Sequence, residues 1–185
     1  MSSYKPVVIL YEDQGGPRKE FGLHNLVVAM VNDLLANDFW RLRSEALKDG
    51  RPSKGNTKLL QKLKQRKELE RMMGGGRHVI AVFDADRPPF TEQEFKEYRE
   101  ANELLHVVLL DRNMETVILA VAECEPSLAS ELVRSATQQK DHSARDSILN
   151  RIAYETHRHA IRDCVKSKVP SLSQLCELVA ALVRT

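Results

Sequence analysis

The sequence contains no run of about 18 apolar residues, and its three cysteines have no close pairing. Without such a run, we expect no membrane-spanning helix and no membrane partner. The polar, acid-containing N-terminus is unlike a secretory signal, so we expect a cytoplasmic protein. Cys124, Cys164 and Cys176 lack the spacing of a zinc or redox motif, and we interpret them as core or surface thiols.

The chain also lacks a large excess of charge of either sign, because its net charge is only +2. The charge is nevertheless segregated, since the stretch 51–71 is strongly basic and the stretch 92–103 is acidic. Leucines at helical spacing in the basic stretch predict one amphipathic helix with its cations outward. Two interpretations stay open, a track for a phosphate backbone and an ordinary solvated helix face. The candidate nucleic-acid-binding residues are Lys54, Lys58, Lys62 and Arg66.

The pattern of apolar segments predicts an α/β fold. With 185 residues and 42% hydrophobic content, the chain is long enough for one well-filled domain. Strand-like and helical segments alternate over the first two-thirds, so we expect a Rossmann-like, mostly parallel sheet of about four strands flanked by helices. Strands are expected at 6–11, 78–83 and 104–110, with a short one around 39–43, and helices at 21–36, 91–102 and 113–123.

The strand pattern stops after Pro126, where three helices are expected at about 127–138, 143–168 with a break, and 171–184. Thr91 with Glu94, and Ser171 with Gln174, have the spacing of capping boxes. We expect residues 1–123 to form the α/β domain and residues 124–185 to form a helical C-terminal extension packed on the same domain.

Acidic residues follow the apolar strands. The strand at 7–11 runs into Glu12 and Asp13, and the strand at 79–83 runs into Asp84 and Asp86. If both strands are parallel, their carboxyl ends share the edge at which open α/β sheets place their ligands. Residues i and i+2 of an extended segment point to the same side, roughly 7 Å apart, so both aspartates can turn toward one cation. A carboxylate cluster of this kind predicts Mg²⁺ or Mn²⁺.

Further acids extend this cluster, although each has an ordinary explanation when taken alone. Asp111 ends the strand at 104–110, and Glu115 lies in the first turn of the next helix. A carboxylate near a helix N-terminus is favoured by the helix dipole whatever the function, and Glu12 with Asp13 is also typical of a loop start. The joint arrangement favours a site. The histidines are scattered, and we assign them structural roles.

These motifs together resemble the TOPRIM fold of topoisomerases, primases and OLD-type nucleases, and most of all its small free-standing relatives. The resemblance covers about residues 5–122. Glu12 matches the family's first glutamate, Asp84 and Asp86 match its Asp-x-Asp motif, and Glu115 matches an extra acid of OLD-like members. The family commonly has glycine after its first glutamate, where this chain has Asp13.

The resemblance implies a metal-dependent nuclease or a related phosphodiester-acting enzyme, a component of a phage-defence or DNA-repair system. Its catalytic residues would be Glu12, Asp84 and Asp86, and its Mg²⁺ or Mn²⁺ ligands would be Glu12, Asp84, Asp86, Asp111 and Glu115. The expected partner is nucleic acid, with DNA favoured over RNA. The alternative, favoured by Asp13, is a non-catalytic TOPRIM-like module that binds nucleic acid or a partner protein such as an ATPase.

Overall fold

The computed structural model describes residues 4–12, 21–36, 38–86, 88–111, 114–130, 142–155 and 158–184. Within these ranges it shows an α/β fold built on a four-stranded, all-parallel sheet, as the sequence predicts. No helix in the described ranges is long and apolar enough to cross a membrane. The strands are β1 (Val7–Tyr11), β2 (Asp49–Pro52), β3 (His78–Asp84) and β4 (Leu105–Leu110).

Helices flank the sheet on both faces. The helices of the first two-thirds are α1 (Gly22–Leu35), α2 (Phe39–Glu45), α3 (Asn56–Lys64), α4 (Arg66–Met73) and α5 (Glu92–Glu100). They are followed by α6 (Met114–Cys124), the 3₁₀ turn η2 (Pro126–Leu128), α8 (His142–Tyr154), α9 (His159–Lys168) and α10 (Pro170–Arg184).

The strand order is β2-β1-β3-β4, so the direction of chain progression reverses between β1 and β3. In the register, Tyr11 lies beside Pro52 on one side and beside Val82 on the other, and Asp84 lies beside Leu110. All four strands therefore end at one edge of the sheet. The position between the ends of β1 and β3 at that edge is the topological switch point at which folds of this kind bind ligands.

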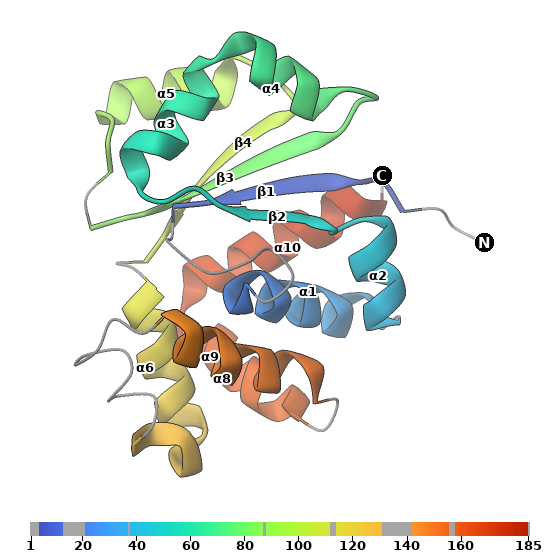
Figure 1. Ribbon diagram of the computed structural model, residues 1–185, viewed down its shortest axis with the longest axis vertical. Helices are drawn as coiled ribbons and strands as arrows, with labels where there is room; N and C mark the ends of the chain where they lie inside the picture. Colours follow the sequence, from blue (N-terminus) through green and yellow to red (C-terminus); the bar gives the residue numbers. More distant parts are fainter. Residues whose placement is uncertain are drawn as a thin grey trace.

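Alternate residues of the strands feed two hydrophobic clusters. Val7, Ile9 and Tyr11 of β1 pack toward α1 and α10, whereas Val8 and Leu10 pack toward α3 and α4. The layers are visible in Figure 1, with α3, α4 and α5 on one face and α1, α2 and α10 on the other. Because β1 is covered on both faces, all five of its residues are buried, which is typical of parallel sheets.

A further layer of helices, α6, α8 and α9, lies beneath α1 (Figure 1). Helix α1 is thus enclosed between the sheet and α8, and residues 22–31 are all buried. Helix α10 of the C-terminal segment contacts β1 and β4 directly. The domain boundary at residue 123 stays a prediction.

The expectation of a strand around 39–43 is wrong, because these residues form α2. The Asp38 carboxylate caps this helix by accepting from the backbone N–H groups of Trp40 and Arg41. The second strand is instead Asp49–Pro52, which has no apolar side chain of strand type. It is the outermost strand of the sheet and joins it through parallel backbone pairing with β1.

The single basic helix is also a wrong prediction, because the chain breaks at Gln65 into α3 and α4. The capping box at Thr91 is confirmed, since its hydroxyl accepts from the Glu94 N–H and the Glu94 carboxylate accepts from the Thr91 N–H. The capping box at Ser171 is wrong. Helix α10 begins one residue earlier, at Pro170, and the Ser171 hydroxyl accepts a hydrogen bond from the Asp111 N–H.

Two of the three cysteines are not thiols, which corrects the interpretation from sequence. A disulfide joins Cys124, at the end of α6, to Cys164 in α9. Cys176 is a buried free thiol. The disulfide forms where α6 packs against α9, and the spacing of the cysteines in the sequence does not indicate it.

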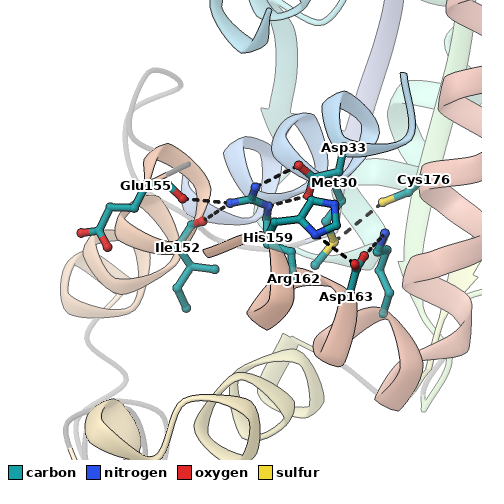
Figure 2. A network of polar contacts seen from close by, with 9 residues as sticks. Met30, Asp33, Ile152, Glu155, His159, Arg162, Asp163 and Cys176 are labelled. Atoms are coloured by element: carbon teal, nitrogen blue, oxygen red, sulfur yellow. Dashed lines mark hydrogen bonds and ion pairs between the residues drawn. The ribbon is translucent and has the colours of Figure 1, made fainter. Parts of the chain in front are cut away.

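A buried ion pair connects α1 to the helices beneath it (Figure 2). The Arg162 guanidinium of α9 donates to both carboxylate oxygens of Asp33 on α1, at 2.6 and 2.9 Å. It also donates to the backbone carbonyls of Ile152 and Glu155 at the end of α8, at 2.9 and 3.1 Å. One planar cation on α9 therefore binds acceptors on α1 and at the end of α8 at once, as a guanidinium fork allows.

A second buried polar network connects β1, α1 and the segment before β2. The His24 ring accepts from the Tyr11 hydroxyl at Nδ1, 3.0 Å away, and donates from Nε2 to the Leu47 carbonyl, 2.7 Å away. This tautomer follows because a carbonyl can only accept. The ring lies against Gly50, where an added Cβ would come within 2.0 Å of it, so only glycine fits there.

We expect His24 to make the fold sensitive to mild acid. Burial lowers the pKa of His24 to about 4, below its ordinary value of 6.5. As the pH falls below 6.5, the unfolded chain therefore gains a proton on His24 before the folded chain does, and stability is lost down to about pH 4. The expected loss is about 2 kcal/mol between pH 7 and pH 5.

Urea unfolding of the wild type and of the His24→Gln variant at both pH values measures this effect. The variant should show a smaller loss, because glutamine does not titrate. His159→Gln is the matched control, since His159 is exposed on α9. An equal loss of stability in the wild type and in His24→Gln would contradict the prediction.

Candidate functional site

The structure places Glu12 and Asp84 together at the switch point. Glu12 directly follows β1, and Asp84 ends the neighbouring strand β3. The Glu12 carboxylate accepts a hydrogen bond from the Asp84 backbone N–H at 2.9 Å, and the Glu12 N–H donates to the Val82 carbonyl at 3.0 Å. Both side chains are partly buried. The first acid of the predicted cluster is therefore fixed against the strand that carries the second.

The turn after β2 lies against the same edge. The Ser53 N–H donates to the Tyr11 carbonyl at 2.8 Å, and the Gly55 N–H donates to the Glu12 carbonyl at 2.7 Å. The turn needs left-handed backbone, with φ of 62° at Lys54 and 108° at Gly55. These bonds bring the N-terminal end of α3 next to the end of β1.

The basic residues of the predicted track separate into two groups. Lys54 lies in the turn at the edge and Lys58 is exposed on the first turns of α3, whereas Lys62 is partly buried and its Nζ lies 3.3 Å from the Ser53 hydroxyl. Arg66 lies beyond the break, at the start of α4, and pairs with Glu70 at 2.8 Å. The chain from α4 leads away to the start of β3 at the opposite edge. Lys54, Lys58 and Lys62 are therefore the cations associated with the acidic edge.

The remaining predicted acids lie around this edge. Asp86 is exposed in the turn after β3, and the preceding Ala85 N–H donates to the Leu110 carbonyl at 2.9 Å. Asp111 follows β4, and Glu115 is exposed in the first turn of α6. Asp13, which departs from the TOPRIM pattern, lies outside the described residues.

The donor set suits Mg²⁺ or Mn²⁺ in kind, because every acid here offers carboxylate oxygen. Within the part of the chain that the structure describes, no three or more acidic, histidine or cysteine side chains are placed to hold a metal ion. These residues therefore do not form a site that could hold a metal ion by protein groups alone. Mg²⁺ is ordinarily held by one or two carboxylates together with water and substrate phosphate, and Glu12 and Asp84 would be the carboxylates available to such an ion here.

Tyr11, which precedes Glu12, points away from the edge. Its hydroxyl is buried against His24 on the α1 face of the sheet. Burial first, and the nearby Cys176 second, raise the pKa of the Tyr11 phenol well above its ordinary value. Tyr11 is therefore a core residue and is not a nucleophile of this edge.

No protein-family model, curated protein or solved structure matches the chain. The resemblance to TOPRIM proteins therefore depends on the residues of this chain alone.

Sequence reasoning missed the polar groups that organise the edge. Ser53 is buried beside Lys62, and Ser171 of α10 accepts from the N–H that follows β4. The sequence suggested a local role for each residue, because Ser53 lies in an expected loop and Ser171 has the spacing of a helix cap. A signal for Ser53 existed in the Lys-Gly pair that follows it, because glycine there marks a left-handed turn.

We expect the Glu12 carboxylate to stabilise the edge as an acceptor. Replacing Glu12 with alanine removes the acceptor of the Asp84 N–H and should lower the free energy of unfolding by about 1 kcal/mol. Glu12→Gln keeps a carbonyl oxygen at that position and should keep most of the stability. Urea unfolding at pH 7 measures both variants.

Glu115→Ala is the control, because it removes an exposed carboxylate from a neighbouring element and should change stability little. If Glu12→Gln destabilises the fold as much as Glu12→Ala, the negative charge matters and the hydrogen bond does not.

Proposed function

We propose that the protein is a metal-dependent enzyme that hydrolyses phosphodiester bonds in nucleic acid, with DNA favoured over RNA. The observation that carries the proposal is the hydrogen bond of 2.9 Å between the Glu12 carboxylate and the Asp84 N–H. It holds the Glu12 carboxylate against the end of the strand that carries Asp84, at the switch point of a parallel sheet, where α/β folds bind their ligands. The TOPRIM-like pattern of the sequence supports the same assignment.

In this proposal the acids and the lysines of the edge have different tasks. Glu12 and Asp84 would hold a divalent ion, with Asp86 as a further carboxylate on the turn after β3. The bound Mg²⁺ or Mn²⁺ would supply neutralisation of charge on the scissile phosphate. Lys54 and Lys58 would bind neighbouring phosphates of the backbone, because Lys54 lies in the turn after β2 and Lys58 lies on the first turns of α3, next to the edge.

Lys62 would be a third cation at this edge. Its Nζ is positioned by the Ser53 hydroxyl, whose own backbone N–H is bonded to the end of β1. A positioned ammonium group near the acidic edge can stabilise the added negative charge as water attacks the phosphorus and the bond to the leaving oxygen breaks. The leaving oxygen takes a proton, and the products are a phosphate monoester and a hydroxyl.

The alternative is a non-catalytic module that binds nucleic acid or a partner protein. One observation favours it, because the described residues place no group of three metal-binding side chains together. The two proposals differ in whether a divalent ion changes the chemistry of a bound strand or changes nothing.

We expect cleavage of single- or double-stranded DNA in the presence of Mg²⁺ or Mn²⁺ and none in EDTA. In the double variant Asp84→Asn with Asp86→Asn, the rate should fall at least a hundredfold, because the ion contributes several kcal/mol and each 1.36 kcal/mol is a factor of ten. Gel analysis of labelled DNA and RNA strands measures the products. The same variant should lose the metal-dependent rise in melting temperature of the wild type.

Glu100→Gln with Glu103→Gln is the matched control, because it removes two exposed carboxylates next to the start of β4, at the opposite edge. A wild type that binds DNA but neither cleaves it nor gains stability with metal would reject the enzyme and support the non-catalytic module. Cleavage that survives the Asp84 and Asp86 substitutions would place the site elsewhere.

The lysines at the edge should make nucleic-acid binding sensitive to salt. Lys54→Gln with Lys58→Gln removes two phosphate contacts and should reduce the slope of log affinity against log salt by about 1.5. Affinity at low salt should fall as well, because fewer counterions are released. Fluorescence anisotropy of a labelled DNA strand, titrated at several salt concentrations, gives the slope.

Lys67→Gln with Arg71→Gln makes the same change of charge on α4, beyond the break at Gln65, and should leave the slope nearly unchanged. If both double variants reduce the slope equally, binding depends on total charge and the edge has no special part in it.

A further inference from the structure

A groove runs along the outer edge of β4, the last strand of the sheet. It has a volume of about 470 Å³ and is lined by residues 105–109 of β4, by Phe95 and Arg99 of α5, and by Gln174 and Leu178 of α10. Successive strand residues point to opposite faces of a sheet, and α5 and α10 cover opposite faces of this one (Figure 1). A groove that contacts five consecutive residues of β4 and both helices therefore lies along the edge itself.

The backbone of β4 presents hydrogen-bonding groups to this groove. The Leu104 and Leu110 carbonyls accept from N–H groups of the β3 segment, at 2.8 and 2.9 Å, so the even-numbered residues face β3. The N–H and carbonyl groups of Val107 and Leu109 therefore point outward, where no hydrogen bond from another described residue reaches them. A row of such groups is a template for pairing with a further strand.

The two edge strands of the sheet differ in how their edges are protected. Strand β2 is only four residues long and contains Asp49, Arg51 and Pro52, and charges and proline both discourage pairing at an edge. Strand β4 has the sequence Leu-His-Val-Val-Leu-Leu, with no lysine, acid, proline or glycine. The β4 edge therefore lacks the sequence features by which proteins prevent strand addition.

Helix α5, which packs on β4, is incompletely covered. None of its residues is buried, whereas every other α-helix in the described ranges has at least one buried residue. Its aromatic residues Phe95 and Tyr98 are only half-buried. A single chain thus leaves both the edge of β4 and the helix beside it partly uncovered, which is typical of a surface that a protein partner completes.

We propose that the β4 edge pairs with the β4 edge of a second copy of this chain, antiparallel, about a two-fold axis at Val107. This proposal does not depend on the function proposed above. In an isologous contact of this kind, outward-pointing residues meet each other, Val107 with Val107 and Leu109 with Leu105. The Leu105 N–H already donates to the Asn102 carbonyl at 3.0 Å, so Val107 and Leu109 supply the N–H groups across the axis.

The charges of α5 favour a second copy over an unrelated partner. Helix α5 leads from the end of β3 to the start of β4, so it runs antiparallel to both strands. Glu92 in its first turn and Arg99 in its last turn are seven positions apart and share one helix face. Both are exposed, and neither forms an ion pair within the described ranges. The two-fold axis places Glu92 of each copy toward Arg99 of the other, so opposite charges meet twice.

Sedimentation equilibrium of the wild-type chain tests the association. We expect the mass to rise from 21.1 kDa to twice that value as the concentration increases. Amide hydrogen exchange measured by NMR locates the contact, because the Val107 and Leu109 N–H groups should be protected in the dimer and exchange rapidly in the monomer. The Val108 N–H, which faces β3, is the internal control and should be protected at every concentration.

Variants test the arrangement of the two copies. Arg99→Glu places like charges together and should weaken association about tenfold, whereas Glu92→Arg with Arg99→Glu exchanges the charges and should restore it. Both positions are exposed, so the fold should not change. Lys67→Glu makes the same change of charge at an exposed position of α4 and should leave association unchanged. Val107→Pro removes an outward N–H without breaking a bond to β3 and should abolish the dimer.

Three results would overturn the proposal. A chain that stays monomeric up to about 1 mM would leave this edge to an extended peptide or to a different protein. A dimer in which the Val107 and Leu109 amides exchange as fast as in the monomer would place the contact on another surface. Equal weakening by Arg99→Glu and by the charge-exchanged variant would reject the two-fold arrangement. If Val107→Pro fails to fold, the hydrogen exchange of the wild type still decides.

Discussion

The packing of α8 and α9 against α1 depends on one buried cation. Arg162 of α9 is bonded to Asp33 on α1 and to the carbonyls at the end of α8, all away from solvent. Removing one partner of such a buried pair leaves an uncompensated charge and costs about 3–5 kcal/mol. The position of α8 and α9 beneath α1 is therefore fixed by a polar contact whose geometry admits few alternatives, and apolar packing fills the space around it.

That constraint reaches the sheet through α1. At its N-terminus the Gly22 N–H donates to the Asp146 carboxylate of α8, and an added Cβ at Gly22 would come within 2.7 Å of the Asp146 backbone. Near the same end, His24 joins α1 to Tyr11 of β1. Helix α1 is thus held from below by ions and from above by a neutral network. The end of β1, where Glu12 begins, is positioned by a helix that has little freedom to move.

Sequence reasoning found the parts of this structure that have a local signal. The buried strands are recognisable from their apolar runs, and the capping box at Thr91 from its spacing. Strand β2 has no such signal. Its sequence, Asp-Gly-Arg-Pro, has no apolar run because β2 is the outermost strand of the sheet, and its glycine makes room for the His24 ring. Helix α2 was misread because five residues do not distinguish alternation from a helical period, and the Asp38 cap decided the outcome.

The candidate site was predictable in outline, since parallel strands that end in acids must bring those acids to one edge. Its details were not predictable, because they depend on pairs of residues far apart in the chain. The hydrogen bond from Asp84 to Glu12 spans 72 residues, and the bond from Asp111 to Ser171 spans 60. The disulfide spans 40. No short stretch of sequence contains both partners of any of these contacts, so they are defined only once the chain is folded.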